Sequence, residues 1–182
     1  MARFKYLSKE DLAPELRQYA GDINLSKLII NNPELARVSS TVASFIRTKM
    51  KLDPRLREMA ILQVGYCARS PYEWSHHVKI GFDFGVSEAD IHALIDDSEG
   101  RPTSLDALTK AVLKAARELA TEIKLSDATF AALQQHLDTP RLLELFYAIC
   151  SYCATVRMLA ALKIDIEPEY QGYLERFPLP KS

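Results

Sequence analysis

Apolar residues recur along most of this chain at the three- and four-residue spacing that gathers them on one face of an α-helix. In the segment 54–68, for example, Leu56, Ala60 and Val64 fall on one side. No segment shows the alternation that is typical of a strand. The pattern predicts an all-α protein with helices near residues 10–20, 33–49, 54–68, 71–84, 88–97, 104–123, 127–137 and 140–163.

Short polar residues mark the expected helix starts. A polar residue before proline combines a side-chain cap with a preset backbone at the first helical position. This pairing occurs as Asn32-Pro33, Asp53-Pro54, Ser70-Pro71 and Thr139-Pro140. Ser87 and Ser126 are expected to cap two further helices. Gly85 is expected to end the helix 71–84, since glycine adopts the left-handed conformation at little cost.

The two ends of the chain depart from this pattern. We predict an N-terminal arm with a helix over 1–24, a helical domain over 25–168, and an extended arm over 169–182, where Pro178 and Pro180 interrupt the chain. Such an arm would wrap a neighbouring subunit or stay disordered. The segment 96–102 is expected to link two groups of helices.

The predicted helix 140–163 is apolar on nearly every side. A helix of this kind must be buried on every side. In a chain of 182 residues this favours a central position or a subunit interface. We therefore expect a homo-oligomer.

The overall charge narrows the classes of partner. A formal net charge of −1 gives no electrostatic basis for binding nucleic acid or an anionic membrane. Arg55 and Arg57 are expected on solvated helix faces. No apolar run approaches the ~20 residues that span a bilayer, and the first residues lack a signal-peptide pattern. These features predict a cytoplasmic protein that uses neither nucleic acid nor membrane, and whose three cysteines are reduced.

The segment 67–78 holds the densest set of reactive side chains. Glu73 and His77 are four residues apart, so they share a helix face, and a carboxylate on an imidazole makes an acid–base relay. The alternative is structural, because Ser70 and Glu73 also fit a capping box. Glu58, on the preceding helix, is either an inward-facing carboxylate or a surface ion-pair residue.

Two adjacent histidines occupy this segment. His76 and His77 point about 100° apart on a helix, so they are not expected to share a metal ion. No zinc site is expected, since the chain has no His pair at four-residue spacing and no Cys/His cluster. Tyr72 lies one turn before His76 and could bond to it. Which of the two histidines faces a pocket stays open.

The cysteines offer a second chemistry. Cys150 and Cys153 have the spacing of a redox pair, but they lie in the middle of a predicted helix, where no helix N-terminus lowers a thiol pKa. Their alternative role is as buried apolar residues.

In order, spacing and turn residues, the stretch Pro54–Leu94 closely resembles the core of the carboxymuconolactone decarboxylase and alkylhydroperoxidase D (AhpD) superfamily. It includes Glu58, the Tyr-Glu-Trp-x-x-His run of 72–77, and Gly85-Val86-Ser87. The resemblance extends over about residues 25–168. It implies an all-α, AhpD-like helical bundle that forms dimers, trimers or hexamers with pockets near subunit interfaces.

The resemblance also implies a chemistry. The peroxidase branch carries a Glu, a Cys-x-x-Cys and a His, which fall here on Glu58, Ser70, Glu73 and His77. Both redox thiols are therefore replaced, and peroxide reduction needs them. The decarboxylase branch works by acid–base catalysis without a cofactor.

We therefore expect a cofactor-independent decarboxylase, lyase or isomerase that acts on a small organic acid or lactone, with aromatic catabolism as a candidate pathway. Its expected catalytic residues are Glu58, Tyr72, Glu73 and His77, and its expected substrate-binding residues are Trp74, His76 and Tyr152. The alternatives are an antioxidant hydroperoxidase that uses Cys67 or the Cys150/Cys153 pair, and a non-enzymatic binding protein on the same fold.

Overall fold

The computed structural model describes residues 1–180, and all regular structure within them is helical, which confirms the predicted all-α class. The elements are the 3₁₀ helices η1 (Lys9–Asp11) and η2 (Pro14–Tyr19), and the α-helices α1 (Asn24–Ile29), α2 (Pro33–Thr48), α3 (Pro54–Cys67), α4 (Pro71–Asp83), α5 (Glu88–Ser98), α6 (Ala107–Thr121), α7 (Asp127–Gln134), α8 (Thr139–Leu162) and α9 (Pro168–Arg176).

Helices α2 to α8 lie where the apolar spacing predicts them, within about three residues at each end. The predictions were wrong near the two termini. Residues 10–20 form short 3₁₀ turns instead of an α-helix, and α1 was missed. The division of the chain into two arms and a domain stays a prediction.

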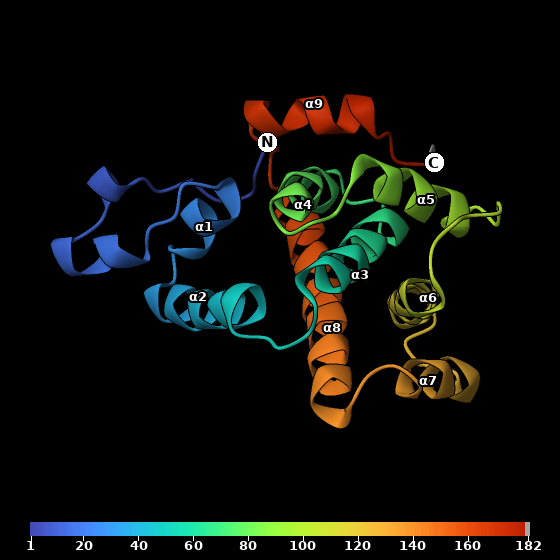
Figure 1. Cartoon of the computed structure of the whole chain (residues 1–182). Coiled ribbons are helices and arrows are strands. Elements are labelled where there is room, and N and C mark those ends of the chain that lie inside the picture. Colours follow the sequence, from blue (N-terminus) through green and yellow to red (C-terminus); the bar gives the residue numbers. More distant parts are fainter. Residues whose placement is uncertain (181–182) are drawn as a thin grey trace.

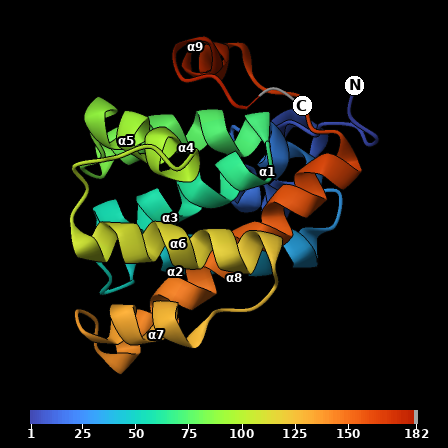
Figure 2. The ribbon, with the colours of Figure 1, turned by 90° about the vertical axis from the view of Figure 1, so that its right-hand side faces the viewer.

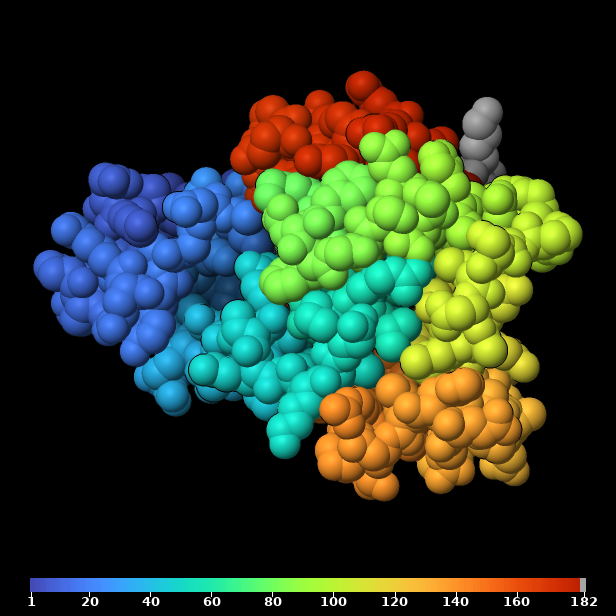
Figure 3. All heavy atoms as spheres, in the orientation of Figure 1, coloured from blue at the N-terminus to red at the C-terminus, as the bar shows by residue number. Residues whose placement is uncertain are grey.

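The expected extended arm instead begins with helix α9, which lies over α4 and α5 (Figures 1 and 3). Its packing explains the difference. Phe177, at the end of α9, is completely buried, and its carbonyl accepts a 2.7 Å hydrogen bond from Nε1 of Trp74. These contacts hold the segment on its own chain. Residues 181–182 of the predicted arm lie outside the described residues.

Most of the predicted caps are formed. The side chains of Asn32, Asp53, Ser87 and Ser126 each accept a hydrogen bond from the backbone N–H three residues later. Helix α8 begins one residue early, because its cap is Asp138 and not Thr139. Gly85 has a φ of 91°, so the predicted left-handed turn after α4 is present.

Helix α3 forms the centre of the molecule. It packs against α4, α6 and α8, and Figures 1 and 2 show these helices on different sides of it. Met59, Ala60, Ile61 and Leu62 follow one another along α3, and none has any exposed surface. A helix that is buried all round holds its polar side chains away from bulk water, which sets the environment of Glu58.

Helix α8 differs from the expectation that it is buried on every side. Leu142, Leu145 and Ile149 pack in the core, but Leu143 is 64% exposed and Tyr147 is 47% exposed. Among the described residues, α8 is also the helix that is long and apolar enough to cross a membrane, contrary to the sequence-based expectation. Its contacts with α3 and α6 are those of a core helix.

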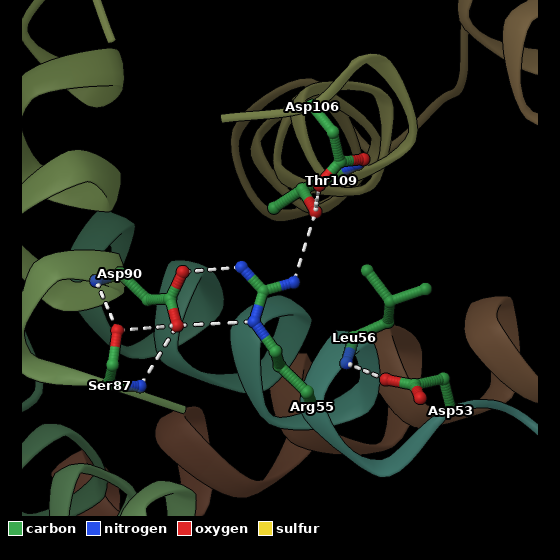
Figure 4. A network of polar contacts seen from close by, with 7 residues as sticks. All are labelled: Asp53, Arg55, Leu56, Ser87, Asp90, Asp106 and Thr109. Atoms are coloured by element: carbon green, nitrogen blue, oxygen red, sulfur yellow. Dashed lines mark hydrogen bonds and ion pairs between the residues drawn. The ribbon is translucent and has the colours of Figure 1, made fainter. Parts of the chain in front are cut away.

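The start of α3 is tied to α5 and α6 through Arg55 (Figure 4). Its guanidinium makes two hydrogen bonds to the Asp90 carboxylate and one of 3.3 Å to the Thr109 hydroxyl. Arg55 was expected on a solvated face, but this ion pair leaves its side chain only 29% exposed. The contacts fix the end of the helix that carries Glu58.

Candidate active site

Helix α4 carries the reactive segment on two different faces. At 100° per residue, Tyr72 and His76 share one side of the helix, while Glu73 and His77 are turned about 100° from them. All four side chains are buried. The two faces therefore meet different neighbours and form two separate polar clusters.

His77 lies between two carboxylates. Its Nδ1 is 2.7 Å from Oε2 of Glu58 on α3, and its Nε2 is 3.0 Å from Oε1 of Glu73 one turn earlier on α4. The Nδ1 contact is a hydrogen bond and the Nε2 contact is an ion pair, so a carboxylate at each nitrogen favours a proton on both. The imidazole is therefore held in its protonated, cationic form.

The energetics agree with this protonation state. Burial alone would lower the pKa of His77, but the charges of Glu73 and Glu58 and their hydrogen bonds outweigh it and raise the pKa to about 9. For Glu58, burial by itself would raise the pKa of the carboxyl group. The positive charges of His77 and Arg57 and their hydrogen bonds outweigh burial and leave that pKa below its ordinary value. Glu58 and His77 are thus a buried ion pair at neutral pH.

Arg57 completes this group, although sequence reasoning placed it in solvent. Its Nε and Nη2 donate hydrogen bonds of 3.0 and 2.9 Å to Oε1 of Glu58. The guanidinium also lies 4.6 Å from the centre of the Phe84 ring, and its Nη1 donates to the carbonyl of Arg47. Because adjacent residues on a helix diverge, no spacing rule signalled this contact. We call Arg57, Glu58, Glu73 and His77 the buried charge group.

Tyr72 and His76 belong to the second cluster, which is built around Glu167. The Tyr72 hydroxyl lies 3.2 Å from Oε1 of Glu167, and Nε2 of His76 lies 3.0 Å from Oε2, although this contact is too poorly aligned for a hydrogen bond. The His76 ring is stacked between Tyr72 and Tyr170. Glu167 also accepts from the backbone N–H of Asn24.

This second cluster fastens both ends of the chain to α4. Nδ1 of His76 donates to the Tyr72 carbonyl at 2.8 Å, which leaves Nε2 facing the Glu167 carboxylate. Burial lowers the pKa of His76 below its ordinary value, partly offset by the Tyr72 carbonyl and the Glu167 charge. No local pattern indicated a role for Glu167, because it lies 95 residues from Tyr72 along the chain.

The two expected aromatic wall residues have different surroundings. Trp74 is completely buried and packs with Tyr66 in the apolar core, at a ring-centre distance of 5.4 Å. The rings of Tyr152 on α8 and His77 pack edge to face with their centres 4.8 Å apart, and Tyr152 is only partly buried. Tyr152 therefore borders the buried charge group, and Trp74 does not.

The capping-box alternative for Glu73 is wrong. The Ser70 side chain makes no cap hydrogen bond, and the Glu73 carboxylate faces His77 instead.

The cysteines do not form an activated thiol site. Burial raises the pKa of the thiols of Cys67 and Cys153, while Cys150 is exposed. Within residues 1–180, no three His, Cys, Asp or Glu side chains are arranged as a metal site.

Two surface pockets of the described residues lie away from the buried charge group. One, of about 430 Å³, is bordered by Asp53, Arg55, Phe84 and Asp106 near the start of α3. The other, of about 260 Å³, lies between α3, α6 and α8. Neither is lined by Glu58, Glu73 or His77.

The model of the carboxymuconolactone decarboxylase family matches residues 33–121, a range that contains α3 and α4 with Glu58, Glu73 and His77. The chain belongs to the carboxymuconolactone decarboxylase/AhpD-like superfamily. This confirms the resemblance that the segment 54–94 indicated. No curated protein matches the chain.

Solved structures place this family member among AhpD-like folds. A peroxidase-related protein with an AhpD core from Ralstonia eutropha JMP134 is 15% identical, with a TM-score of 0.79 and 95% of each chain covered. A cysteine-to-alanine variant of the debrominase Bmp8, in complex with 2,3,4-tribromopyrrole, is 19% identical, with a TM-score of 0.80, covering 97% of this chain and 100% of that one.

A third structure, a peroxidase-related protein from Silicibacter sp. TM1040, is 18% identical with a TM-score of 0.71, covering 82% of this chain and 78% of that one. At these identities the likeness establishes the AhpD-like fold alone. The neighbours differ in activity, so the reaction has to be argued from the side chains of this family member.

Proposed function

We propose that the protein is a cofactor-independent acid–base enzyme that moves a proton on a small organic acid or lactone. The observation that carries the proposal is the buried row of Glu58, His77 and Glu73, with contacts of 2.7 and 3.0 Å. Titratable groups held in contact away from water are typical of proton-transfer sites.

The contacts favour Glu73, rather than His77, as the group that exchanges a proton with the substrate. Both nitrogens of His77 already face carboxylates, so the imidazolium has no free lone pair with which to act as a base. Oε1 of Glu73 faces His77, whereas its Oε2 accepts no hydrogen bond within residues 1–180. In this arrangement His77 and Glu58 are positioning residues that orient Glu73.

The charge balance of the group favours an anionic substrate. Arg57 and His77 carry two positive charges and Glu58 and Glu73 carry two negative ones, so the group is neutral at rest. A proton accepted by Glu73 leaves a net positive charge in a buried place, which is costly. A carboxylate on the substrate would offset that charge, as an organic acid provides.

Substrate access requires a movement, because the side chains of Glu73 and His77 are buried. Tyr152 is the partly exposed side chain whose ring touches His77, and it lies beside Ile46 and Ala148 at the packing of α2 on α8. We propose that displacement of Tyr152 opens the path, which makes Tyr152 a substrate-contacting residue and leaves Trp74 in the core.

The hydroperoxidase alternative has less support. Ser70 and Glu73 occupy the positions of the family's redox cysteines, and the buried thiols of Cys67 and Cys153 have raised pKa values, which disfavours the nucleophilic thiolate. A non-enzymatic binding role would not explain why four charged side chains are buried together in the buried charge group.

The test is turnover of carboxymuconolactone and a series of small keto acids and lactones, followed by NMR as carbon dioxide release or deuterium uptake from D₂O. Glu73→Gln should reduce the rate by at least ~100-fold, the usual contribution of an acid–base group. The exposed Glu34→Gln serves as the matched control.

A triple variant with Cys67, Cys150 and Cys153 replaced by serine separates the alternatives. It should retain acid–base turnover, and its rate of peroxide consumption should equal that of the natural protein. Full activity in Glu73→Gln would contradict the proposal, and loss of a peroxidase activity in the triple variant would favour the antioxidant reading. Turnover of none of these compounds would favour the binding role.

A further inference from the structure

A cavity of about 260 Å³ lies between the end of α3 and helices α6 and α8. Its lining is mostly aliphatic, with two thiols and one guanidinium: Val64, Cys67, Ala68, Ala120, Cys153, Val156, Arg157 and Ala160. It opens to solvent at the surface of the molecule. The cavity therefore suits a small ligand.

This cavity is separate from the buried charge group. Cys67 follows Glu58 by nine residues on the same helix, and nine steps of 100° place it about 180° round α3. Glu58 faces α4, while Val64 and Cys67 face α6 and α8 together with Val156 and Cys153. The two regions use opposite sides of the central helix.

Arg157 gives the cavity its charge. The exposed guanidinium donates to the carbonyl of Cys153, one turn earlier on α8, which folds it back along the helix. Within residues 1–180 it lies within ion-pair distance of no carboxylate, whereas Arg117, on the neighbouring helix α6, is paired with Asp97 at 2.8 Å. Arg157 thus remains available to an anion from solution.

The thiols add no opposing charge. Burial raises the pKa of both Cys67 and Cys153, so both are neutral at pH 7. A neutral thiol behaves as a small apolar group with a weak donor. The cavity consequently combines one positive charge at its edge with an apolar floor.

We propose that this cavity binds a small organic monoanion, whose carboxylate pairs with Arg157 and whose hydrocarbon body lies against Val64 and Val156. A guanidinium holds a carboxylate through two parallel hydrogen bonds, and aliphatic walls favour an apolar body over a hydrated inorganic anion. The site is independent of the acid–base function and could hold an effector or a product.

The test uses sodium benzoate as probe and the thiol of Cys67, which is partly exposed, as reporter. In a Cys150→Ser background, which removes the exposed competing thiol, alkylation of Cys67 by N-ethylmaleimide is followed by peptide mass spectrometry. Benzoate should slow the reaction saturably, whereas the same concentration of neutral benzamide, or of sodium chloride at equal ionic strength, should slow it less.

Charge and space are then tested separately. Arg157→Gln should weaken protection by benzoate about 5-fold, the effect of losing one partly solvated ion pair. Arg141→Gln, on the same helix but paired with Asp138, should leave it unchanged. Ala160→Leu should reduce protection by filling the cavity, and circular dichroism checks the fold of each variant.

Equal protection by benzoate and benzamide, or unchanged protection in Arg157→Gln, would overturn the proposal. Methyl NMR shifts of Val64 and Val156 on adding benzoate give a second measurement, and their absence would also overturn it. Arg157→Gln should keep its proton-transfer activity, so failure of this proposal is distinguishable from failure of the proposed function.

Discussion

Nδ1 of His77 on α4 lies 2.7 Å from Oε2 of Glu58 on α3, and both side chains are buried. This contact joins two successive helices through opposite charges that water does not screen. Removing one member of such a pair is costly, because the other is left buried and unpaired.

Arg57→Leu should lower the free energy of unfolding by about 3 kcal/mol, because it leaves Glu58 short of a partner within the core. The matched control is Arg55→Leu, two residues earlier on the same helix. Arg55 pairs with Asp90 where both are partly exposed (Figure 4), so its loss should cost about 1 kcal/mol. Urea unfolding measures both, and equal losses would contradict the burial argument.

Stability should fall in alkaline solution. The pKa of His77 is raised from 6.5 to about 9 in the folded protein, so its contribution is complete below pH 6.5 and is lost as the pH rises through about 9. The loss should reach up to ~3 kcal/mol. Thermal melts between pH 6 and 10 should show this slope in the natural protein and in the exposed-site control His136→Gln, and much less of it in His77→Gln.

Stability should also fall in acidic solution, as the pH decreases. The pKa of Glu58 is lowered in the folded protein, so its stabilisation is present above its ordinary value of 4.5 and is lost as the pH falls below it. A stability profile that is flat from pH 6 to 10 would contradict the assignment of His77, and one that is flat from pH 5 down to 2 would contradict that of Glu58.

Ser70→Ala should change stability by less than about 0.5 kcal/mol, because the Ser70 side chain makes no cap hydrogen bond. Ser87→Ala is the comparison, since Ser87 accepts from the Asp90 N–H and takes part in a capping box. Its loss should cost about 1 kcal/mol. If Ser70→Ala lost more stability than Ser87→Ala in chemical denaturation, Ser70 would have the capping role after all.

Glu167→Ala should release both termini from α4. It removes the acceptor of the Asn24 N–H and the Tyr72 hydroxyl and should cost about 1–3 kcal/mol. Amide hydrogen exchange should quicken at Asn24 and along α9, while α3 stays protected. The exposed Glu169→Ala should leave both rates unchanged, and equal effects of the two variants would rule out the fastening role of Glu167.

We expect a second copy of the chain to cover the exposed apolar face of α2 and α8. Phe45 and Tyr147 meet edge to face at 6.4 Å. Val38 lies two turns before Phe45 on α2, Leu143 lies one turn before Tyr147 on α8, and both are exposed. The double change Leu143→Glu and Tyr147→Lys should reduce the mass found by light scattering. Ile123→Glu, at an exposed apolar residue elsewhere, should not. A monomeric natural protein would contradict the expectation.

The sequence by itself determined the local structure. Apolar spacing fixed helices α2 to α8, and polar caps such as Asn32 and Asp53 marked where they begin, because these effects act within one or two turns of the chain. The spacing of Glu73 and His77 likewise put them on one face, as the 3.0 Å contact bears out.

The tertiary structure decided which charges are buried together and which are not. Arg57 and Arg55 look alike in the sequence, yet only the packing of α3 against its neighbours buries Arg57 completely on Glu58. The role of Glu167 depends on a return of the chain after 95 residues. Such contacts depend on how distant helices pack, which no local pattern encodes. Local spacing places Glu73 beside His77, but only the packing of α3 on α4 adds the second carboxylate, that of Glu58.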